Sequence, residues 1–336
     1  MKDYTEKDIV ESVRKRPAMY LGSNGVNGIS KLFCGLIIEF IELTENGNID
    51  VTIELNEKSN SIKFKSKESF SPFLNQLNPK SRNIYFFHFY CLKYLSKEFE
   101  IVQEENLLEL KFKLNYELLK VQSHDYYDVL DELKHTAILN RDCSILIKEK
   151  NGEYENQNYL KYPNGIKRYY DEVHQKVLGT PKIEIHVDKE FSDFQLQFVF
   201  AYRTDWYPEP TILSFANSKP TINHDSIVEG IRNGFFHAIE KWISEKEMND
   251  HIPEKDKMDN GLILISQLKS PKYKSYENYK DVDDQNIENE IEEYIRKVAF
   301  YFFESNPESV ENFCQRFNQN SITNGIFKKK ATDNNV

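Results

Sequence analysis

A run of apolar residues between Ile29 and Ile41 constrains this chain more than any other feature of its sequence. The apolar positions recur at the three- and four-residue intervals of one helix face: Ile29, Leu32, Phe33, Leu36, Ile37, Phe40 and Ile41. Such a stripe predicts a helix that buries one side in a protein core. Gly28 and Ser30 offer a start for this helix, and Asn46-Gly47 offers a stop.

Composition excludes several classes of protein. The 336 residues suffice for two domains of ordinary size. The formal charge is 44 − 54 = −10, which disfavours strong DNA binding, because non-specific affinity comes mainly from Lys and Arg on phosphates. No apolar run approaches the roughly 20 residues of a membrane helix, and Met1–Glu11 lacks the apolar core of a signal peptide. We expect a cytoplasmic protein with no membrane contact.

The cysteines and histidines predict no metal site. Four cysteines lie far apart and none pairs with another at metal-ligand spacing: Cys34, Cys91, Cys143 and Cys314. Buried, reduced thiols are the expected state in a cytoplasmic protein. The eight histidines show no paired spacing either, and each is interpreted as a structural residue.

Two successive α+β patterns follow from the remaining periodicity. The first half predicts strands at Asp50–Leu55, Ser61–Lys65, Phe99–Val102 and Leu107–Leu114, helices at Ile84–Phe99 and Tyr126–Leu139, and a hairpin of Ser144–Lys148 and Tyr159–Tyr162 around Asn151-Gly152. The second half predicts helices at Asn164–Val177, Ser226–Ser244 and Asp284–Glu304, with strands at Lys182–Val187, Leu196–Tyr202, Ile212–Ala216 and Leu262–Leu268. In the last helix, we expect Ile287, Ile291, Ile295, Val298 and Phe302 to form the apolar stripe.

The stretch Arg14–Gly22 reads RKRPAMYLG. It resembles the RKRPGMYIG motif of the ATPase subunit of type IIA DNA topoisomerases, the family of gyrase B and the corresponding subunit of topoisomerase IV. Five further blocks resemble that family in the same order: Leu133–Lys150, Tyr162–Tyr170, Phe198–Trp242, Asn260–Tyr273 and Tyr301–Ser309.

The resemblance implies an α+β fold. It implies a degenerate GHKL-like (Bergerat) α/β sandwich at residues 1–165 and a ribosomal-S5-like transducer domain at residues 166–318. Residues 319–336 would form a polar tail.

The resemblance also implies where ATP and Mg²⁺ would bind, and the residues at those positions do not match the family. The glutamate general base aligns with Gly35, which cannot take a proton, and the Mg²⁺-binding asparagine aligns with Glu39. We expect Glu39 and Glu42 on a solvated or loop-facing side of their helix. The aspartate that recognises the amino group of adenine aligns with Lys65-Ser66. The lysine by which the transducer domain contacts the γ-phosphate aligns with Asn278.

Two further elements of the family are missing from the sequence. Residues 57–83 contain no glycine, although a phosphate loop at a helix N-terminus needs glycine for its backbone N–H groups to converge on phosphate. No EGDSA-like motif marks a toprim domain for DNA cleavage. We therefore expect no catalytic residues, no bound cofactor and no metal. An aromatic cluster can occupy the volume of the nucleotide, although core packing explains it equally well: Tyr85, Phe86, Phe87, Phe89 and Tyr90.

These features lead to three hypotheses. The first is a pseudo-ATPase that binds another protein, such as a topoisomerase subunit or an operon neighbour, as a regulator, a decoy, or a defence or toxin–antitoxin component. The second is a divergent ATP-binding subunit of a type II topoisomerase or related ATPase. The third is a DNA mimic or DNA-binding module. Nucleotide binding separates the first two, and a salt-dependent DNA shift identifies a DNA-binding module.

Overall fold

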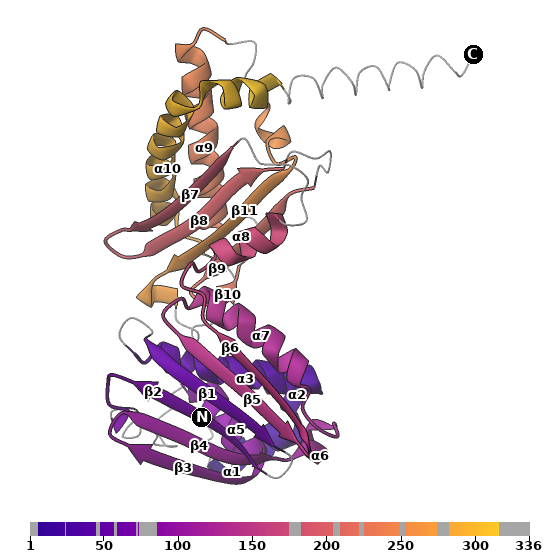
Figure 1. Cartoon of the computed structure of the whole chain (residues 1–336). Coiled ribbons are helices and arrows are strands. Elements are labelled where there is room, and N and C mark those ends of the chain that lie inside the picture. Colours follow the sequence, from indigo (N-terminus) through magenta and orange to yellow (C-terminus); the bar gives the residue numbers. More distant parts are fainter. Residues whose placement is uncertain are drawn as a thin grey trace, which may run out of the picture. The chain divides into compact units, whose positions relative to one another are not determined.

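The computed structural model describes residues 6–23, 25–44, 48–56, 59–71, 73, 86–174, 183–203, 209–221, 225–248, 253–273 and 282–315. The chain divides into two compact units, the first reaching Gly165 and the second beginning at Ile166 (Figure 1). Asn278 and the expected polar tail at residues 319–336 lie outside the described residues.

The first unit is a sheet with helices on one face. Its six strands are β1 (Ile49–Asn56), β2 (Asn60–Ser66), β3 (Ser96–Glu104), β4 (Leu107–Leu114), β5 (Ser144–Asn151) and β6 (Tyr154–Leu160). Their order is β3-β4-β2-β1-β5-β6, and β1 runs parallel to β5 while the other neighbours are antiparallel. The helices are α1 (Glu6–Lys15), α2 (Pro17–Leu21), α3 (Val26–Ile41), α5 (Phe87–Leu95), α6 (Tyr116–Leu119) and α7 (Tyr126–Leu139). In Figure 1 helices α3, α5 and α7 lie behind the sheet.

The core of this unit lies between α3 and the sheet. Alternate residues of β1 and β2 point toward the helices and are buried, as period-two patterning requires. The Phe40 ring stacks on Phe64 with centroids 4.0 Å apart, and Phe33 meets Phe112 edge-on at 5.7 Å. The predicted amphipathic helix is therefore confirmed, and its apolar stripe joins β2 and β4 in one core.

The second unit combines a five-stranded sheet with a long helix pair. Its strands are β7 (Glu184–Glu190), β8 (Gln195–Tyr202), β9 (Thr211–Ala216), β10 (Lys219–Pro220) and β11 (Leu262–Lys269), in the order β10-β9-β11-β8-β7. Its helices include α8 (Lys167–His174), α9 (Ser226–Glu245) and α10 (Gln285–Ser305), with short 3₁₀ turns η4 (Lys255–Lys257) and η5 (Pro271–Tyr273). Figure 1 shows α9 and α10 side by side on one face of this sheet and α8 on the other. Asp225 and Asp284 cap the two long helices by accepting backbone N–H bonds in their first turns.

Several predicted boundaries differ from those observed. Helix α3 begins at Val26 and ends at Ile41, so Gly28 lies inside it rather than at its start. The aromatic helix was predicted to reach Phe99, but α5 ends at Leu95 and β3 begins at Ser96. The hydroxyl of Ser96 donates to the Leu92 carbonyl at 2.7 Å, which satisfies one of the last carbonyls and lets the chain leave the helix early.

The predicted stripe of α10 was incomplete. Ala299 and Phe303 continue the fully buried face begun by Ile291 and Ile295, whereas Ile287, Val298 and Phe302 are partly buried and pack against the same core. The four cysteines are buried free thiols, as predicted. Among the described helices, none has the length and hydropathy that crossing a bilayer requires.

Candidate functional site

Gly35 on α3 lies directly against the imidazole of His88 on α5. A Cβ atom built on Gly35 would lie 2.3 Å from Nε2 of His88, far inside van der Waals contact. Glycine is therefore the residue that lets the ring occupy this place. The position that the resemblance assigns to a general base carries no side chain, and a neighbouring ring fills its space.

Glu39 follows Gly35 by one helical turn and reaches the start of α5. Its Oε1 accepts the His88 backbone N–H at 2.7 Å, and its Oε2 accepts the Phe89 backbone N–H at 3.2 Å. Nδ1 of His88 lies 2.8 Å from Oε1. Glu39 is 5% exposed, so the prediction of a solvated position was wrong for this residue. Glu42 is half-buried at the end of α3.

Helix α5 is held between opposite charges. The Glu39 carboxylate satisfies two of the backbone N–H groups that the first turn of a helix leaves without intrahelical partners. At the other end, Nε of Arg14 donates to the Tyr94 carbonyl at 2.9 Å. A negative group at the N-terminus and a positive group at the C-terminus both complement the helix macrodipole. Arg14 belongs to the RKRPAMYLG stretch, which thereby has a structural role here.

Burial and hydrogen bonding act on the Glu39 carboxyl group in opposite directions. Burial raises the pKa of Glu39, and the hydrogen bonds from His88 and Phe89 oppose that shift without cancelling it. For Glu39 to accept from Nδ1 as a carboxylate, His88 must carry its proton there. Cys34, one residue before Gly35, is buried, and burial raises the pKa of its thiol to about 12. It is therefore an inert thiol at neutral pH.

Aromatic side chains fill the space beside this pair. The ring of Phe73 packs edge-on against Phe40, Phe86 and Phe89, with centroids 4.8, 4.6 and 5.6 Å away. All four rings are buried. Edge-to-face packing of this kind stabilises a core and leaves little room for another ring system. Tyr85, the first member of the predicted aromatic cluster, lies outside the described residues.

Two other predicted positions, Lys65 and Ser66, lie in the described part of the chain, and their side chains are on opposite faces of β2. Lys65 is exposed on β2, where it stands opposite Asp50 of β1 and Leu107 of β4 in the sheet. Because Phe64 points to α3, its neighbour Lys65 points to the opposite face of the sheet. Ser66 is buried at the end of β2, where its hydroxyl accepts the Glu68 backbone N–H at 3.2 Å.

Sequence reasoning missed His88 as the partner of Glu39, because the two residues are 49 positions apart and share no motif. A second histidine, which is more deeply buried than His88, also lies beside a glutamate. His124 lies between the Tyr116 hydroxyl, 2.9 Å from Nδ1, and Glu149 Oε1, 3.1 Å from Nε2. Within the part of the chain that the structure describes, no three His, Cys, Asp or Glu side chains gather closely enough to hold a metal ion.

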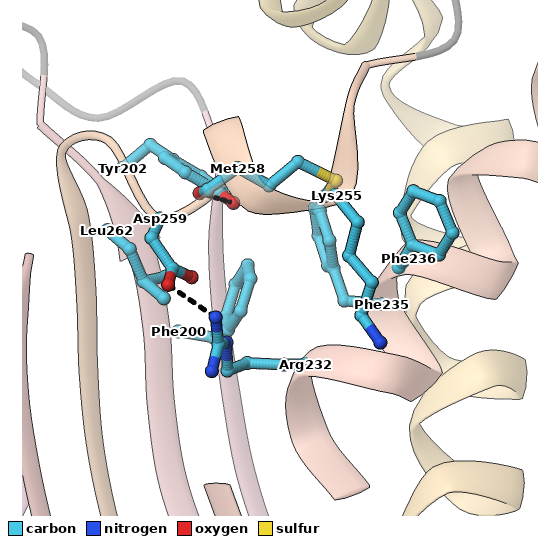
Figure 2. A pocket seen from close by; sticks show the side chains of 9 residues that line it. All are labelled: Phe200, Tyr202, Arg232, Phe235, Phe236, Lys255, Met258, Asp259 and Leu262. Carbon is cyan, nitrogen blue, oxygen red and sulfur yellow. Dashed lines mark hydrogen bonds and ion pairs between the residues drawn. The ribbon is translucent and has the colours of Figure 1, made fainter. Parts of the chain in front are cut away.

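Two hollows lie elsewhere. In the second unit, a small slot is lined by Phe200, Tyr202, Arg232, Phe235, Phe236, Lys255, Met258, Asp259 and Leu262 (Figure 2). Figure 2 shows Arg232 pointing to Asp259, with which it forms an ion pair, while Lys255 lies near Phe236. Its volume of about 10 Å³ admits roughly one water molecule. A wider hollow of about 420 Å³ lies at the ends of β1, β5 and β6, where Lys150 and Glu155 already pair at 2.7 Å.

The first unit, a mixed sheet covered on one face by α3, α5 and α7, has the architecture of GHKL-type ATPase domains. Comparison with solved structures supports this fold. The ATPase domain of Thermus thermophilus gyrase B, solved with an aminocoumarin, superposes with a TM-score of 0.71 at 16% identity, covering 96% of this chain and 97% of that chain. The B-subunit of Myxococcus xanthus DNA gyrase gives a TM-score of 0.65 at 18% identity, covering 89% and 97%.

Sequence comparisons agree with the fold. Residues 165–331 match the family model described as DNA gyrase B. The DNA gyrase B protein of Mycoplasmoides gallisepticum is 20% identical, with 96% of this chain and 59% of that protein aligned. The DNA gyrase B protein of Archaeoglobus fulgidus is 23% identical, with 98% and 60% aligned. The chain is similar to DNA gyrase B proteins along nearly its whole length, and it spans about 60% of the length of these two relatives.

Proposed function

We propose that this gyrase-B-like protein is a pseudo-ATPase: a cytoplasmic binding or regulatory protein that neither holds nor hydrolyses ATP. In this proposal residues 1–165 are a degenerate ATPase-like domain and residues 166–318 are transducer-like. The observation that carries the proposal is the contact of Gly35, Glu39 and His88, in which the protein's own side chains occupy a region where the resemblance would put a general base, Mg²⁺ and phosphate.

The physical argument has two parts. A general base needs a proton acceptor within reach of the attacking water, and Gly35 supplies none, while the His88 ring occupies the space that a side chain would need. A helix N-terminus attracts phosphate through its free N–H groups and positive dipole end. At α5 the Glu39 side chain already accepts two of those N–H groups, which are therefore not free to bind a phosphate.

Calorimetry with ATP and Mg²⁺ tests the proposal. We expect no binding heat and no ATP hydrolysis, while the ATPase domain of Thermus thermophilus gyrase B serves as a positive control under the same conditions. A thermal melt of the same sample establishes that the protein is folded. A dissociation constant of about a micromolar or tighter would overturn the pseudo-ATPase proposal.

The alternative is a divergent ATP-binding subunit of a type II DNA topoisomerase or related ATPase. The coverage favours it, because the chain aligns with 97% of a solved gyrase B ATPase domain. The same calorimetry separates the two functions. Light scattering adds a second criterion: nucleotide-ordered segments would drive dimerisation of an active clamp, so a shift in mass on adding a non-hydrolysable ATP analogue would support the alternative.

A protein partner, such as a topoisomerase subunit or an operon neighbour, follows from the proposed loss of ATP chemistry. The acidic chain argues against strong binding to DNA. Titration of the purified protein with purified gyrase subunits tests the first kind of partner directly. Saturable binding that persists without nucleotide would support a regulator or decoy, and a gel shift of DNA that weakens with salt would instead indicate a DNA-binding module.

A further inference from the structure

The outer edge of β6 differs from the other sheet edges in the described structure. The edge strands are β3 and β6 in the first unit and β7 and β10 in the second. Strands β3 and β7 carry several charges, and β10 has two residues, one of them Pro220. These are the devices by which proteins discourage pairing of free edges. Strand β6 reads YENQNYL, and Glu155 is its single charged residue.

Aromatic side chains are exposed along the same strand. Tyr154 is 81% exposed and Tyr159 is 64% exposed, and their odd sequence separation places them on opposite faces of the sheet. Two side-chain hydrogen bonds also fix β6 to its own unit. The Tyr126 hydroxyl of α7 donates to the Asn158 side chain at 2.8 Å, and the Asn156 amide donates to Glu149 of β5 at 3.1 Å. A preordered strand with an open edge can add another strand at low entropic cost.

The sequence around β6 is complementary to itself. In an antiparallel pair of two copies related by a two-fold axis, directly opposite residues share a face, so the residue numbers of each pair sum to an even number. Centring the axis on Gln157 gives the following pairs, the second member coming from the second copy: Glu153 with Lys161, Tyr154 with Leu160, Glu155 with Tyr159, Asn156 with Asn158, and Gln157 with itself.

None of these pairs places like charges opposite each other, and several join complementary groups. Glu153 and Lys161 are opposite charges, and symmetry produces that pair twice. Tyr154 meets Leu160, an aliphatic side chain that is 3% exposed in a single copy. Glu155 pairs with Lys150 of its own copy at 2.7 Å and has a second carboxylate oxygen that can accept from a tyrosine hydroxyl. The amides can bond to one another. Cross-strand pairs of these types stabilise a sheet. We propose that β6 is an interaction surface for a second copy of this chain, joining two sheets edge to edge in this register.

The opposite edge does not offer the same match. If β3 paired with itself about Phe99, Glu98 would stand opposite Glu100 of the second copy, and a register centred on Ile101 would oppose Glu98 and Glu104. Like charges directly opposite destabilise a strand pair. The contrast between the two edges assigns the second copy to β6.

Charge reversal at the ends of β6 tests the proposal. We expect the full chain to dimerise in sedimentation velocity runs over a concentration series. Lys161→Glu and Glu153→Lys should each weaken the dimer by about tenfold, because two symmetry-related pairs turn from attraction to repulsion. The double variant Glu153→Lys/Lys161→Glu restores both pairs and should recover the original dissociation constant to within about threefold.

A matched control reverses one charge at the other edge. Lys97→Glu on β3 should leave the dimer unchanged. Lys161 also donates to the Asp142 carbonyl at 2.9 Å, so circular dichroism of each variant checks the fold, and Glu153→Lys provides the test without touching that bond. A chain that stays monomeric at its highest soluble concentration would overturn the proposal. So would a dimer that ignores both single reversals, or one that the double variant does not restore. No nucleotide is involved, so the result is independent of the pseudo-ATPase proposal.

Discussion

Both units contain a helix in which glycine permits an unusually close contact, but the contacts are of different kinds. In the second unit α9 meets α10 through Gly230 and Gly234. A Cβ atom at Gly234 would lie 2.7 Å from the Glu292 carbonyl oxygen and 2.7 Å from Cβ of Ile295. In the first unit the neighbour of Gly35 is the imidazole of His88, whose side chain is 29% exposed.

This difference indicates a separate structural role for the glycine in each helix. On α9 the obstacle to a side chain is another helix's backbone, so glycine sets the distance between two helices. On α3 the obstacle is a single ring, which can turn away only by giving up its bond to Glu39. The α9 contact is therefore a packing requirement of the fold, whereas the α3 contact is specific to the Gly35, Glu39 and His88 group.

The largest expected effect is the loss of unfolding free energy when a buried side chain of α3 is truncated. Leu36 is fully buried beside Gly35, and Leu36→Ala should lower the free energy of unfolding by about 2–5 kcal/mol through lost burial and a cavity. Chemical denaturation measures the change. Met19→Ala is the control, because Met19 is 61% exposed and should change stability by no more than about 0.5 kcal/mol. An equally small loss for Leu36→Ala would mean that the stripe does not face the core.

The next effect tests the helix pair. Gly234→Ala should cost about 2–3 kcal/mol of unfolding free energy, since α10 must move to admit the methyl group. Ser244→Ala, at an exposed position on the same helix, controls for helix propensity and should be close to neutral. If Gly234→Ala were stabilising, as alanine is in an unobstructed helix, the close approach of α9 and α10 would be wrong.

Gly35→Ala should cost less, about 1–2 kcal/mol, because a side chain can yield where a backbone cannot. The sharper expectation is a coupling. In a His88→Ala background the obstacle is gone, so Gly35→Ala should become neutral or slightly stabilising. A double-mutant cycle by denaturation measures this coupling. Additive losses would show that something other than His88 restricts Gly35.

The smallest expected effect is a pH dependence. Because the pKa of Glu39 is raised by burial, the folded state holds this proton more tightly than the unfolded state. Its contribution is fully present below the ordinary carboxyl pKa and is lost as pH rises through the folded pKa. The unfolding free energy of the wild type, minus that of Glu39→Gln, should therefore fall as the pH rises above the ordinary carboxyl pKa of 4.5. A difference that rises with pH would show that the hydrogen bonds outweigh burial.

The sequence alone determined the local elements and, through the resemblance, the fold class. The stripe on α3 was predicted because helical periodicity is written in neighbouring residues. A hairpin turn at Asn151-Gly152 was predicted for the same local reason, and the structure places the turn one residue later: Asn151 pairs with Tyr154 at the end of β5, so the two turn residues are Gly152, with a positive φ of 61°, and Glu153. Helix α7 begins and ends where its pattern does, at Tyr126 and Leu139. The proposed loss of the ATP site also came from the sequence, and it stays a prediction until nucleotide binding is measured.

Only the tertiary structure decided the environment of Glu39. From the sequence, this residue was a charge on a helix, and a charge is expected to face water. The fold brings the first turn of α5 and His88 to it from 49 positions away, and those donors make a buried carboxylate tolerable. The same folding explains why position 35 is glycine, since the clash with His88 exists only once α5 has docked on α3. Contacts between distant segments depend on how whole elements pack, and no local pattern encodes that.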